Sequence, residues 1–149
     1  ESIDLSEKKY NDSIKIIQLF GSWCPNCVDE TKFFNRWRKE NSELAKNIQF
    51  VALAFENFKD ETQALRALKK SKAKLEMDYP LILVDYDKTI KPQDVLPIDK
   101  ARAFPTTLFL NKKNEVVKIH TGFSGQATGA FFENFEKLFT QTVTDLLNK

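Results

Sequence analysis

Short apolar runs of the kind that form buried strands recur along this chain. They cover residues 15–20, 48–55 and 81–84. Two segments between them, at about 25–40 and 61–76, repeat apolar residues at spacings of three and four, which predicts helices. Because strands alternate with helices in this way, the pattern favours a largely parallel sheet.

The same spacing predicts which side chains of the two helices face inward. The expected inner residues are Cys27, Glu30, Phe34 and Trp37 in the first helix, and Ala64, Leu65, Leu68 and Leu75 in the second. A proline at position 80 then ends the second helical segment before the third strand.

The last third of the chain predicts a hairpin and a closing helix. Residues 106–111 and 115–120 are rich in strand formers and flank a short polar loop, which is typical of a β-hairpin. Between residues 85 and 104 two prolines interrupt the pattern, and we expect a short helix or turns there. The closing helix carries Phe131, Phe132, Phe135, Leu138, Phe139, Val143, Leu146 and Leu147 at helical spacings.

Together these elements predict an α/β fold in which a central mixed β-sheet is flanked by helices on both faces. A chain of 149 residues suits one domain, so we expect a single domain over residues 1–149. Apolar residues make up 42% and charged residues 30%, an ordinary globular mixture. The formal net charge of +2 is too small to indicate nucleic-acid binding.

Location is only weakly constrained by the sequence. No apolar run approaches the length of a membrane span. The chain begins at Glu1 without a methionine, which indicates a processed or trimmed chain. The lack of a visible signal peptide is therefore weak evidence about location.

Both cysteines of the chain lie in one short stretch, GSWCPNC, between the first predicted strand and the first predicted helix. Cys24 would lie at the helix N-terminus, where unpaired backbone N–H groups and the helix dipole favour a thiolate. Cys27 would lie one turn further on, within reach of Cys24. We therefore expect Cys24 to be the exposed attacking thiol and Cys27 the partly buried resolving thiol.

Two other roles compete with redox chemistry as interpretations of the cysteine pair. A structural zinc site normally needs four ligands, and the chain offers two cysteines and one distant histidine, His120. A purely structural disulfide would close so small a loop that it gains little chain entropy. The redox interpretation is favoured, and neither a metal nor another cofactor is expected.

The sequence resembles the thioredoxin superfamily, and within it the extracytoplasmic thiol–disulfide oxidoreductases of the TlpA/ResA type. The resemblance rests on WCPNC after IIQLFGS, with FPTTLFLNKKNEVV some 80 residues later, and extends over most of the chain. It implies a thioredoxin-like fold and a redox-active CxxC disulfide. It also implies that Pro105 is a cis-proline facing the cysteines. Phe104, just before it, would then border the substrate together with Trp23 and Pro25.

Glu30 is the candidate proton carrier. Helical spacing puts it on the same face as Cys27, and a partly buried carboxylate would have a raised pKa that suits proton exchange with a thiol. The resemblance implies the same role. Many thioredoxins carry a buried Asp six residues before the first cysteine, where this chain has Gln18, which cannot accept a proton at neutral pH. In the hairpin loop, where the family often has glycine, Asn114 can supply the left-handed conformation.

These observations predict an enzyme, a thiol–disulfide oxidoreductase that reduces protein disulfides outside the cytoplasm, in the periplasm or tethered to a membrane. Its partners would be protein thiol or disulfide substrates and a membrane or soluble redox protein that supplies electrons; a monomer is expected. The alternatives are a thiol peroxidase and a binding or chaperone module that keeps the fold. The sequence does not decide the direction of electron flow.

Overall fold

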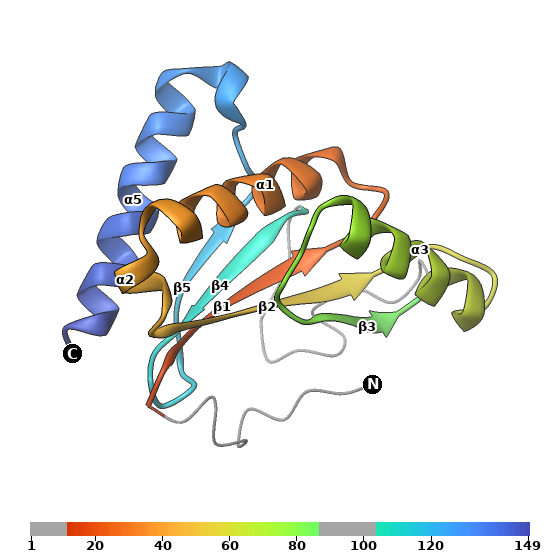
Figure 1. Ribbon diagram of the computed structural model, residues 1–149, viewed down its shortest axis with the longest axis horizontal. Helices are drawn as coiled ribbons and strands as arrows, with labels where there is room; N and C mark the ends of the chain where they lie inside the picture. Colours follow the sequence, from red (N-terminus) through yellow and green to blue (C-terminus); the bar gives the residue numbers. More distant parts are fainter. Residues whose placement is uncertain (1–11, 87–103) are drawn as a thin grey trace.

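A five-stranded mixed sheet forms the centre of the protein in the computed structural model, which describes residues 12–86 and 104–149 (Figure 1). The strands are β1 (Ile14–Phe20), β2 (Ile48–Phe55), β3 (Leu81–Asp85), β4 (Thr106–Leu110) and β5 (Val116–Thr121). Their order is β3-β2-β1-β4-β5. β1, β2 and β3 are parallel, whereas β4 and β5 join as an antiparallel pair.

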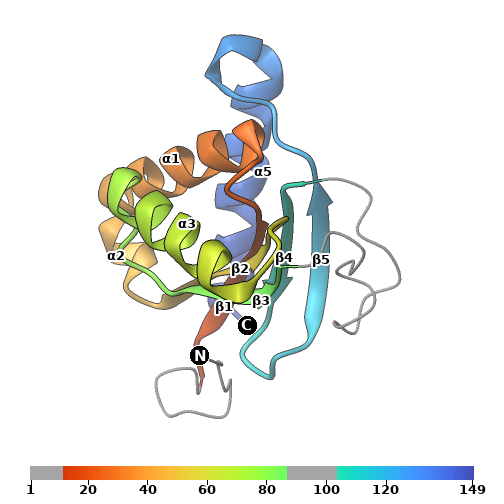
Figure 2. The same cartoon turned by 90° about the vertical axis from the view of Figure 1, so that its right-hand side faces the viewer.

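The helices described lie together on one face of this sheet (Figure 2). They are α1 (Pro25–Glu40), α2 (Ser42–Ala45), α3 (Glu61–Lys74), the 3-10 turn η2 (Gln126–Thr128) and α5 (Ala130–Leu147). The predicted mixed sheet with flanking helices and a closing hairpin is confirmed. Helices were predicted on both faces, whereas those among residues 12–86 and 104–149 lie on one face. The short helix or turns expected before Phe104 fall largely outside the described residues.

Side chains of β1 alternate between two apolar clusters, one on each face of the sheet. Ile16 and Phe20 face the helices, whereas Ile17 and Leu19 face the opposite side. On the helix side, rings from α1, from α5 and from Phe123 in the segment before η2 pack edge-on or tilted around Phe33, at centroid distances of 5.3 to 6.0 Å. Burying each of these rings contributes roughly 1.5–3 kcal/mol, so the phenylalanines tie α1 and α5 to each other.

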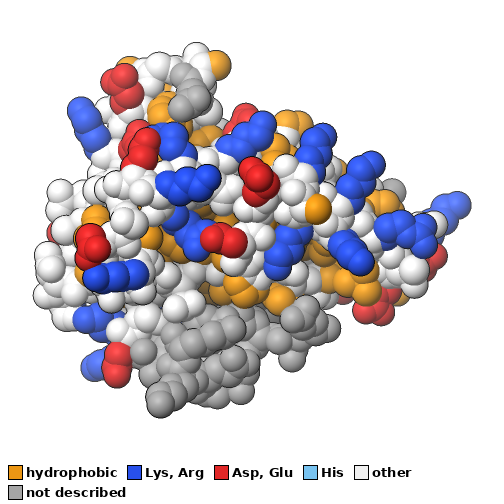
Figure 3. Space-filling model, in the orientation of Figure 1, with side chains coloured by type: hydrophobic (Ala, Val, Ile, Leu, Met, Phe, Trp, Pro, Cys, Tyr) orange, Lys and Arg blue, Asp and Glu red, His pale blue; other side chains and the backbone are white. Residues whose placement is uncertain are grey.

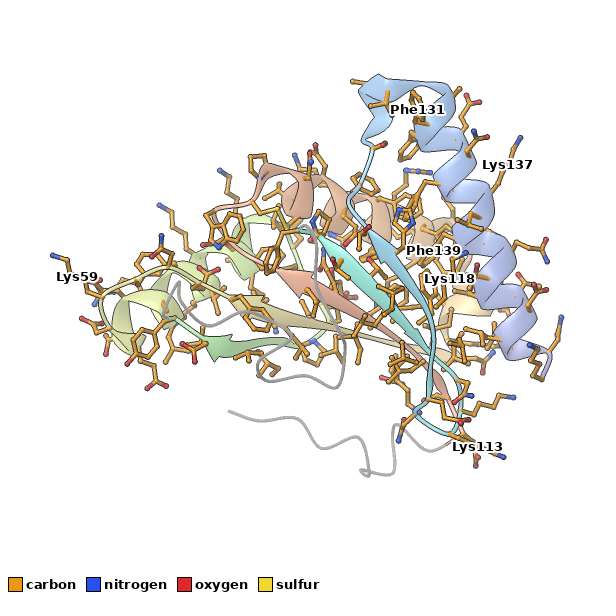
Figure 4. The ribbon with its side chains drawn as sticks, turned by 180° about the vertical axis from the view of Figure 1, so that it is seen from behind. Lys59, Lys113, Lys118, Phe131, Lys137 and Phe139 are labelled. Atoms are coloured by element: carbon orange, nitrogen blue, oxygen red, sulfur yellow. A yellow bond between two sulfur atoms is a disulfide. The ribbon has the colours of Figure 1, made fainter. Side chains whose placement is uncertain are left out.

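Three apolar residues of the predicted helical repeats are exposed. The prediction that Leu65 lies on the inner face of its helix was therefore wrong. Leu65 is 47% exposed, Leu138 42% and Phe131 72%. Each follows or precedes a buried residue, and one step along a helix turns a side chain by about 100°. In Figure 4 Phe139 lies between α5 and the sheet, while Phe131 lies at the outer start of the helix. The buried face of α3 and of α5 is therefore narrower than the set of apolar residues at helical spacing in each helix.

Lysine and arginine side chains are spread over the outer surface of α1 and α3 (Figure 3). On α3 they are Arg66, Lys69, Lys70, Lys72 and Lys74. The face beneath is apolar, with Ala64 and Leu68 buried. This arrangement is that of an ordinary amphipathic helix with a solvated outer side.

The carboxyl ends of β1 and β2 meet at the same edge of the sheet, and the chain enters β4 beside them. Phe20 at the end of β1 pairs with Ala54 of β2, and Gln18 pairs with Thr107 of β4. The turn from β1 into α1 leaves the sheet at this edge. It carries the two cysteines, so three strands and a helix N-terminus converge on them.

Candidate active site

A disulfide joins Cys24 and Cys27 at the start of α1, with their Cα atoms 5.2 Å apart. Cys24 is the N-cap of the helix: its backbone is extended, and its sulfur accepts a hydrogen bond from the Cys27 N–H at 3.1 Å. Pro25 follows in the first turn, where a missing N–H costs nothing. The N-terminal dipole thus points at the sulfur of Cys24, as the sequence predicts.

Both cysteines are buried in this disulfide-bonded state. Cys24 is 3% exposed and Cys27 is fully buried. The expectation that Cys24 is exposed is therefore wrong for this state, because Cys24 packs into the apolar cluster between the sheet and the helices. The positional difference between the cysteines remains, since only Cys24 caps the helix.

The turn before Cys24, residues 21–23, is hydrogen-bonded to the end of β2. Trp23 donates a hydrogen bond from Nε1 to the carbonyl of Phe55 at 2.8 Å. A Cβ at Gly21 would lie 2.4 Å from that indole nitrogen, so only glycine leaves room for the ring. The Ser22 N–H and hydroxyl both donate to the carboxylate of Glu56. Glu56 is not among the site residues predicted from the sequence.

An aromatic group borders the disulfide. The ring of Phe104 meets Trp23 edge-on at a centroid distance of 5.1 Å and Phe55 at 6.0 Å. The Phe104–Pro105 peptide bond is cis. The Pro105 carbonyl accepts a hydrogen bond from the Gly122 N–H at 2.7 Å, which joins the start of β4 to the end of β5. Trp23 remains 52% exposed and so presents a large apolar surface beside the cysteines.

Glu30 lies on the inner face of α1, one turn after Cys27, and is fully buried. Its Oε2 accepts a hydrogen bond from the Thr107 hydroxyl at 2.8 Å. Its Oε1 has no hydrogen-bond partner in the part of the chain that the structure describes. Burial raises the pKa of Glu30 to about 8, although the neighbouring Thr107 hydroxyl and Gln18 amide offset part of that rise. The raised pKa favours the protonated form of this carboxyl group at neutral pH.

A buried polar network lies beside Glu30 and holds the backbone of Cys27. The Cys27 carbonyl accepts hydrogen bonds from Thr31 Oγ1 at 2.9 Å and from Gln18 Nε2 at 3.3 Å. The Tyr79 hydroxyl donates to Gln18 Oε1 at 3.3 Å. Burial raises the pKa of Tyr79, so its hydroxyl stays a donor. Gln18 is thus a structural bridge, a role the sequence does not reveal because Tyr79 comes from a distant loop.

The described residues hold neither a cluster suited to a metal ion nor a helix suited to cross a membrane. They contain no group of three or more histidine, cysteine, aspartate or glutamate side chains that could hold a metal ion. None of the described helices is long and apolar enough to cross a membrane. His120 lies on β5, where it pairs with Thr107 of β4, and its ring is 4.8 Å from that of Phe135.

Comparisons with known proteins agree with this geometry. No protein-family model matches the chain. It is 26% identical over 127 residues to the thiol-disulfide oxidoreductase ResA of Halalkalibacterium halodurans, a match that covers 82% of this chain and 60% of that protein. The chain thus spans about 60% of the length of this curated relative.

Solved structures share the fold. A thiol:disulfide interchange protein DsbE from Chlorobium tepidum superposes with a TM-score of 0.63 at 18% identity, covering 90% of this chain and 82% of the other. A secreted thiol-disulfide isomerase from Corynebacterium glutamicum also gives 0.63 at 18% identity, covering 85% and 70%. The predicted resemblance to the ResA/TlpA type is confirmed by the match to ResA. The chain has a thioredoxin-like fold, and its sequence is similar to that of ResA.

Proposed function

We propose that this protein is a thiol–disulfide oxidoreductase that works through the Cys24/Cys27 couple and reduces disulfides in other proteins. The observation that carries the proposal is the position of the disulfide, which caps the N-terminus of a helix whose next turn carries a buried carboxyl group, Glu30. The similarity to ResA supports the same activity.

The reduced form would act in two exchange steps. The Cys24 thiolate, favoured by the helix N-terminus, attacks one sulfur of a substrate disulfide, and the other substrate sulfur leaves as a thiolate. The Cys27 thiolate then attacks the sulfur of Cys24 in this mixed disulfide. The second substrate thiolate leaves, so two electrons pass to the substrate and the Cys24–Cys27 disulfide forms.

Glu30 is proposed to carry the proton that the second step requires. Cys27 must lose its proton to attack, and it is fully buried. The carboxylate form of Glu30, one helical turn away, can accept that proton because its pKa of about 8 approaches that of a thiol. Gln18 lies beside Glu30, but its amide cannot accept a proton at neutral pH.

Trp23, Pro25, Phe104 and Pro105 are proposed to form the substrate-binding surface. Trp23 is half exposed beside the disulfide and packs against Phe104. Apolar segments that flank a substrate disulfide would bury this surface. Peptide segments with aliphatic residues next to the cystine are therefore the expected substrates.

The oxidised couple must be reduced again, so a second redox protein is needed. We propose a membrane or soluble thiol protein as electron donor and a site of action outside the cytoplasm. The resemblance to TlpA/ResA-type proteins and the secreted relative from Corynebacterium glutamicum support that location. Fractionation of cells that carry the full gene would test it, and a purely cytoplasmic protein would contradict it.

Insulin reduction with dithiothreitol as electron source tests the activity. We expect Cys24→Ser to reduce the rate to background and Cys27→Ser to accumulate a mixed disulfide, visible by mass spectrometry. Lys113→Ser, in the exposed turn between β4 and β5, serves as the control and should retain full activity. Full activity of Cys24→Ser would refute the proposal.

The direction of electron flow needs a separate measurement. Equilibration of the Cys24–Cys27 couple with glutathione gives its reduction potential. A potential close to that of thioredoxin supports the reducing role. A potential as oxidising as that of DsbA would assign the protein to disulfide formation instead.

A further inference from the structure

The carboxyl end of β2 holds a second buried carboxylate that the proposed chemistry does not use. Glu56 is 2% exposed and directly follows Phe55, the last residue of β2. Phe55 faces the sheet side opposite the helices, and Ala54 faces the helices. Alternation along the strand therefore turns Glu56 toward the side of α1.

The strand register brings Glu56 opposite the active-site turn. Phe20 of β1 pairs with Ala54 of the parallel strand β2, so Ser22 comes opposite Glu56, two residues further along each chain. The Ser22 N–H donates to Oε2 of Glu56 at 2.7 Å, and the Ser22 hydroxyl donates to Oε1. Both oxygens of one buried carboxylate are thus bonded to a residue two positions before Cys24.

The backbone around Glu56 is itself fixed. The Glu56 N–H donates to the carbonyl of Asp85 at 2.8 Å, and the Phe58 N–H donates to that of Tyr86 at 2.9 Å. These bonds continue the pairing of β2 with β3 beyond the last strand residues. A carboxylate on so rigid a support can hold the turn in one conformation.

We propose that Glu56 is a positioning residue: it fixes the turn Gly21–Trp23 so that Cys24 stays at the N-cap of α1 and Trp23 stays beside the disulfide. The bond from Trp23 Nε1 to the carbonyl of Phe55 provides the second anchor, from the adjacent residue of the same strand end. The expected loss of activity rests on the proposed oxidoreductase function, whereas the expected effect of Glu56 on the position of the turn does not.

Three variants separate the hydrogen bonds of Glu56 from its charge and from general stability. Glu56→Ala removes both bonds to Ser22. In Glu56→Gln the amide oxygen can still accept a hydrogen bond from the Ser22 N–H. The amide NH2 can donate a hydrogen bond to the Ser22 hydroxyl oxygen. Asp60→Ala is the matched control, because Asp60 also accepts a backbone N–H, that of Gln63 at 2.8 Å, but at the start of α3.

Two measurements are made on each variant of the full chain. We expect kcat/KM for insulin reduction to fall on the order of tenfold in Glu56→Ala, since misplacing a reacting group slightly is costly. Glu56→Gln and Asp60→Ala should stay near the wild-type rate. Acrylamide quenching of tryptophan fluorescence reports on Trp23, because Trp37 is fully buried, and it should increase in Glu56→Ala alone.

Unchanged rate and unchanged quenching in Glu56→Ala would overturn the proposal. Equal losses in Glu56→Gln and Glu56→Ala would also overturn it, because they would assign the effect to charge. If Glu56→Ala does not fold, Ser22→Ala decides: a smaller change in the same direction supports the proposal, and no change refutes it. If the wild-type protein is inactive, the proposed function fails, and quenching alone still decides whether Glu56 positions the turn.

Discussion

Two buried carboxylates border the disulfide, and they differ in how many hydrogen-bond donors face them. Glu56 has both oxygens bonded to Ser22, at the end of β2. Glu30, on the inner face of α1, has Oε2 bonded to Thr107, while Oε1 lacks a partner among residues 12–86 and 104–149. Burial without enough donors disfavours the charged form, so the pKa of Glu30 is raised above the ordinary value of a glutamate. The number of donors thus separates a group suited to exchange protons from one suited to anchor a turn.

The largest expected effect concerns the pH dependence of stability, and Glu30→Gln measures it. Between about pH 4.5 and 8 folded Glu30 keeps a proton that the unfolded chain releases, so the free energy of unfolding falls as pH rises through this range. The slope for one group is at most about 1.4 kcal/mol per pH unit. Urea unfolding at pH 5, 6.5 and 8 should show this loss in the wild-type protein and a flatter profile in Glu30→Gln. Parallel profiles would contradict the raised pKa.

The other carboxylate should matter for stability through its two bonds. Glu56→Ala leaves the N–H and hydroxyl of Ser22 without their acceptor, which costs about 1–3 kcal/mol. Urea unfolding at pH 7 measures the loss, with Asp60→Ala as the reference for a lost carboxylate elsewhere. A loss in Glu56→Ala no larger than in the reference would mean that Glu56 does not hold the turn.

Removing the Thr107 donor to Glu30 should increase the difference between Glu30 and Glu56. Thr107→Val keeps the side-chain shape but takes away the hydroxyl that donates to Oε2. We expect the pKa of Glu30 to rise further and the free energy of unfolding at pH 7 to fall by about 0.5–1.5 kcal/mol. NMR titration of the Glu30 carboxyl carbon in both proteins checks the direction of the pKa change, and a lowered value would be inconsistent with it.

The smallest effect is expected for an exposed carboxylate. Glu43 forms an ion pair with Lys46 at 2.6 Å, and its side chain is 86% exposed. Water screens such pairs, so Glu43→Gln should change the free energy of unfolding by no more than about 0.5 kcal/mol. Urea unfolding of Glu43→Gln, measured beside Glu30→Gln and the wild-type protein, gives this change in the free energy of unfolding. A large change would mean that burial is not what separates Glu30 and Glu56 from exposed carboxylates such as Glu43.

The parts of the fold that depend on local pattern could be predicted from the sequence. The first helix begins at Pro25 and ends at Glu40 as expected, because the proline fits its first turn and the inner face repeats at three and four. Glu30 could be assigned to the buried face by the same spacing. Asn114 adopts the left-handed conformation in the hairpin turn, at a φ of 67°.

Features that depend on strand register could not be predicted. Glu56 and Ser22 are 34 residues apart, and only the pairing of Phe20 with Ala54 brings them together. Strand alternation after the apolar run 48–55 was the available signal that Glu56 faces the helices. The burial of Cys24 and the exposure of Leu65 depend on how closely helices and sheet approach, which apolar spacing does not specify.

The sulfur of Cys24 accepts the hydrogen bond that a serine or aspartate oxygen accepts at most helix starts. The first turn of α1 is therefore stabilised by an atom whose charge changes with oxidation state. Folding and reduction are linked in a thermodynamic cycle. If the Cys24 thiolate raises the free energy of unfolding of the reduced protein, the reduction of the folded disulfide becomes more favourable by the same amount of free energy. Substitutions in the first turn of α1 would then alter the strength of the protein as a reductant without contacting its substrate.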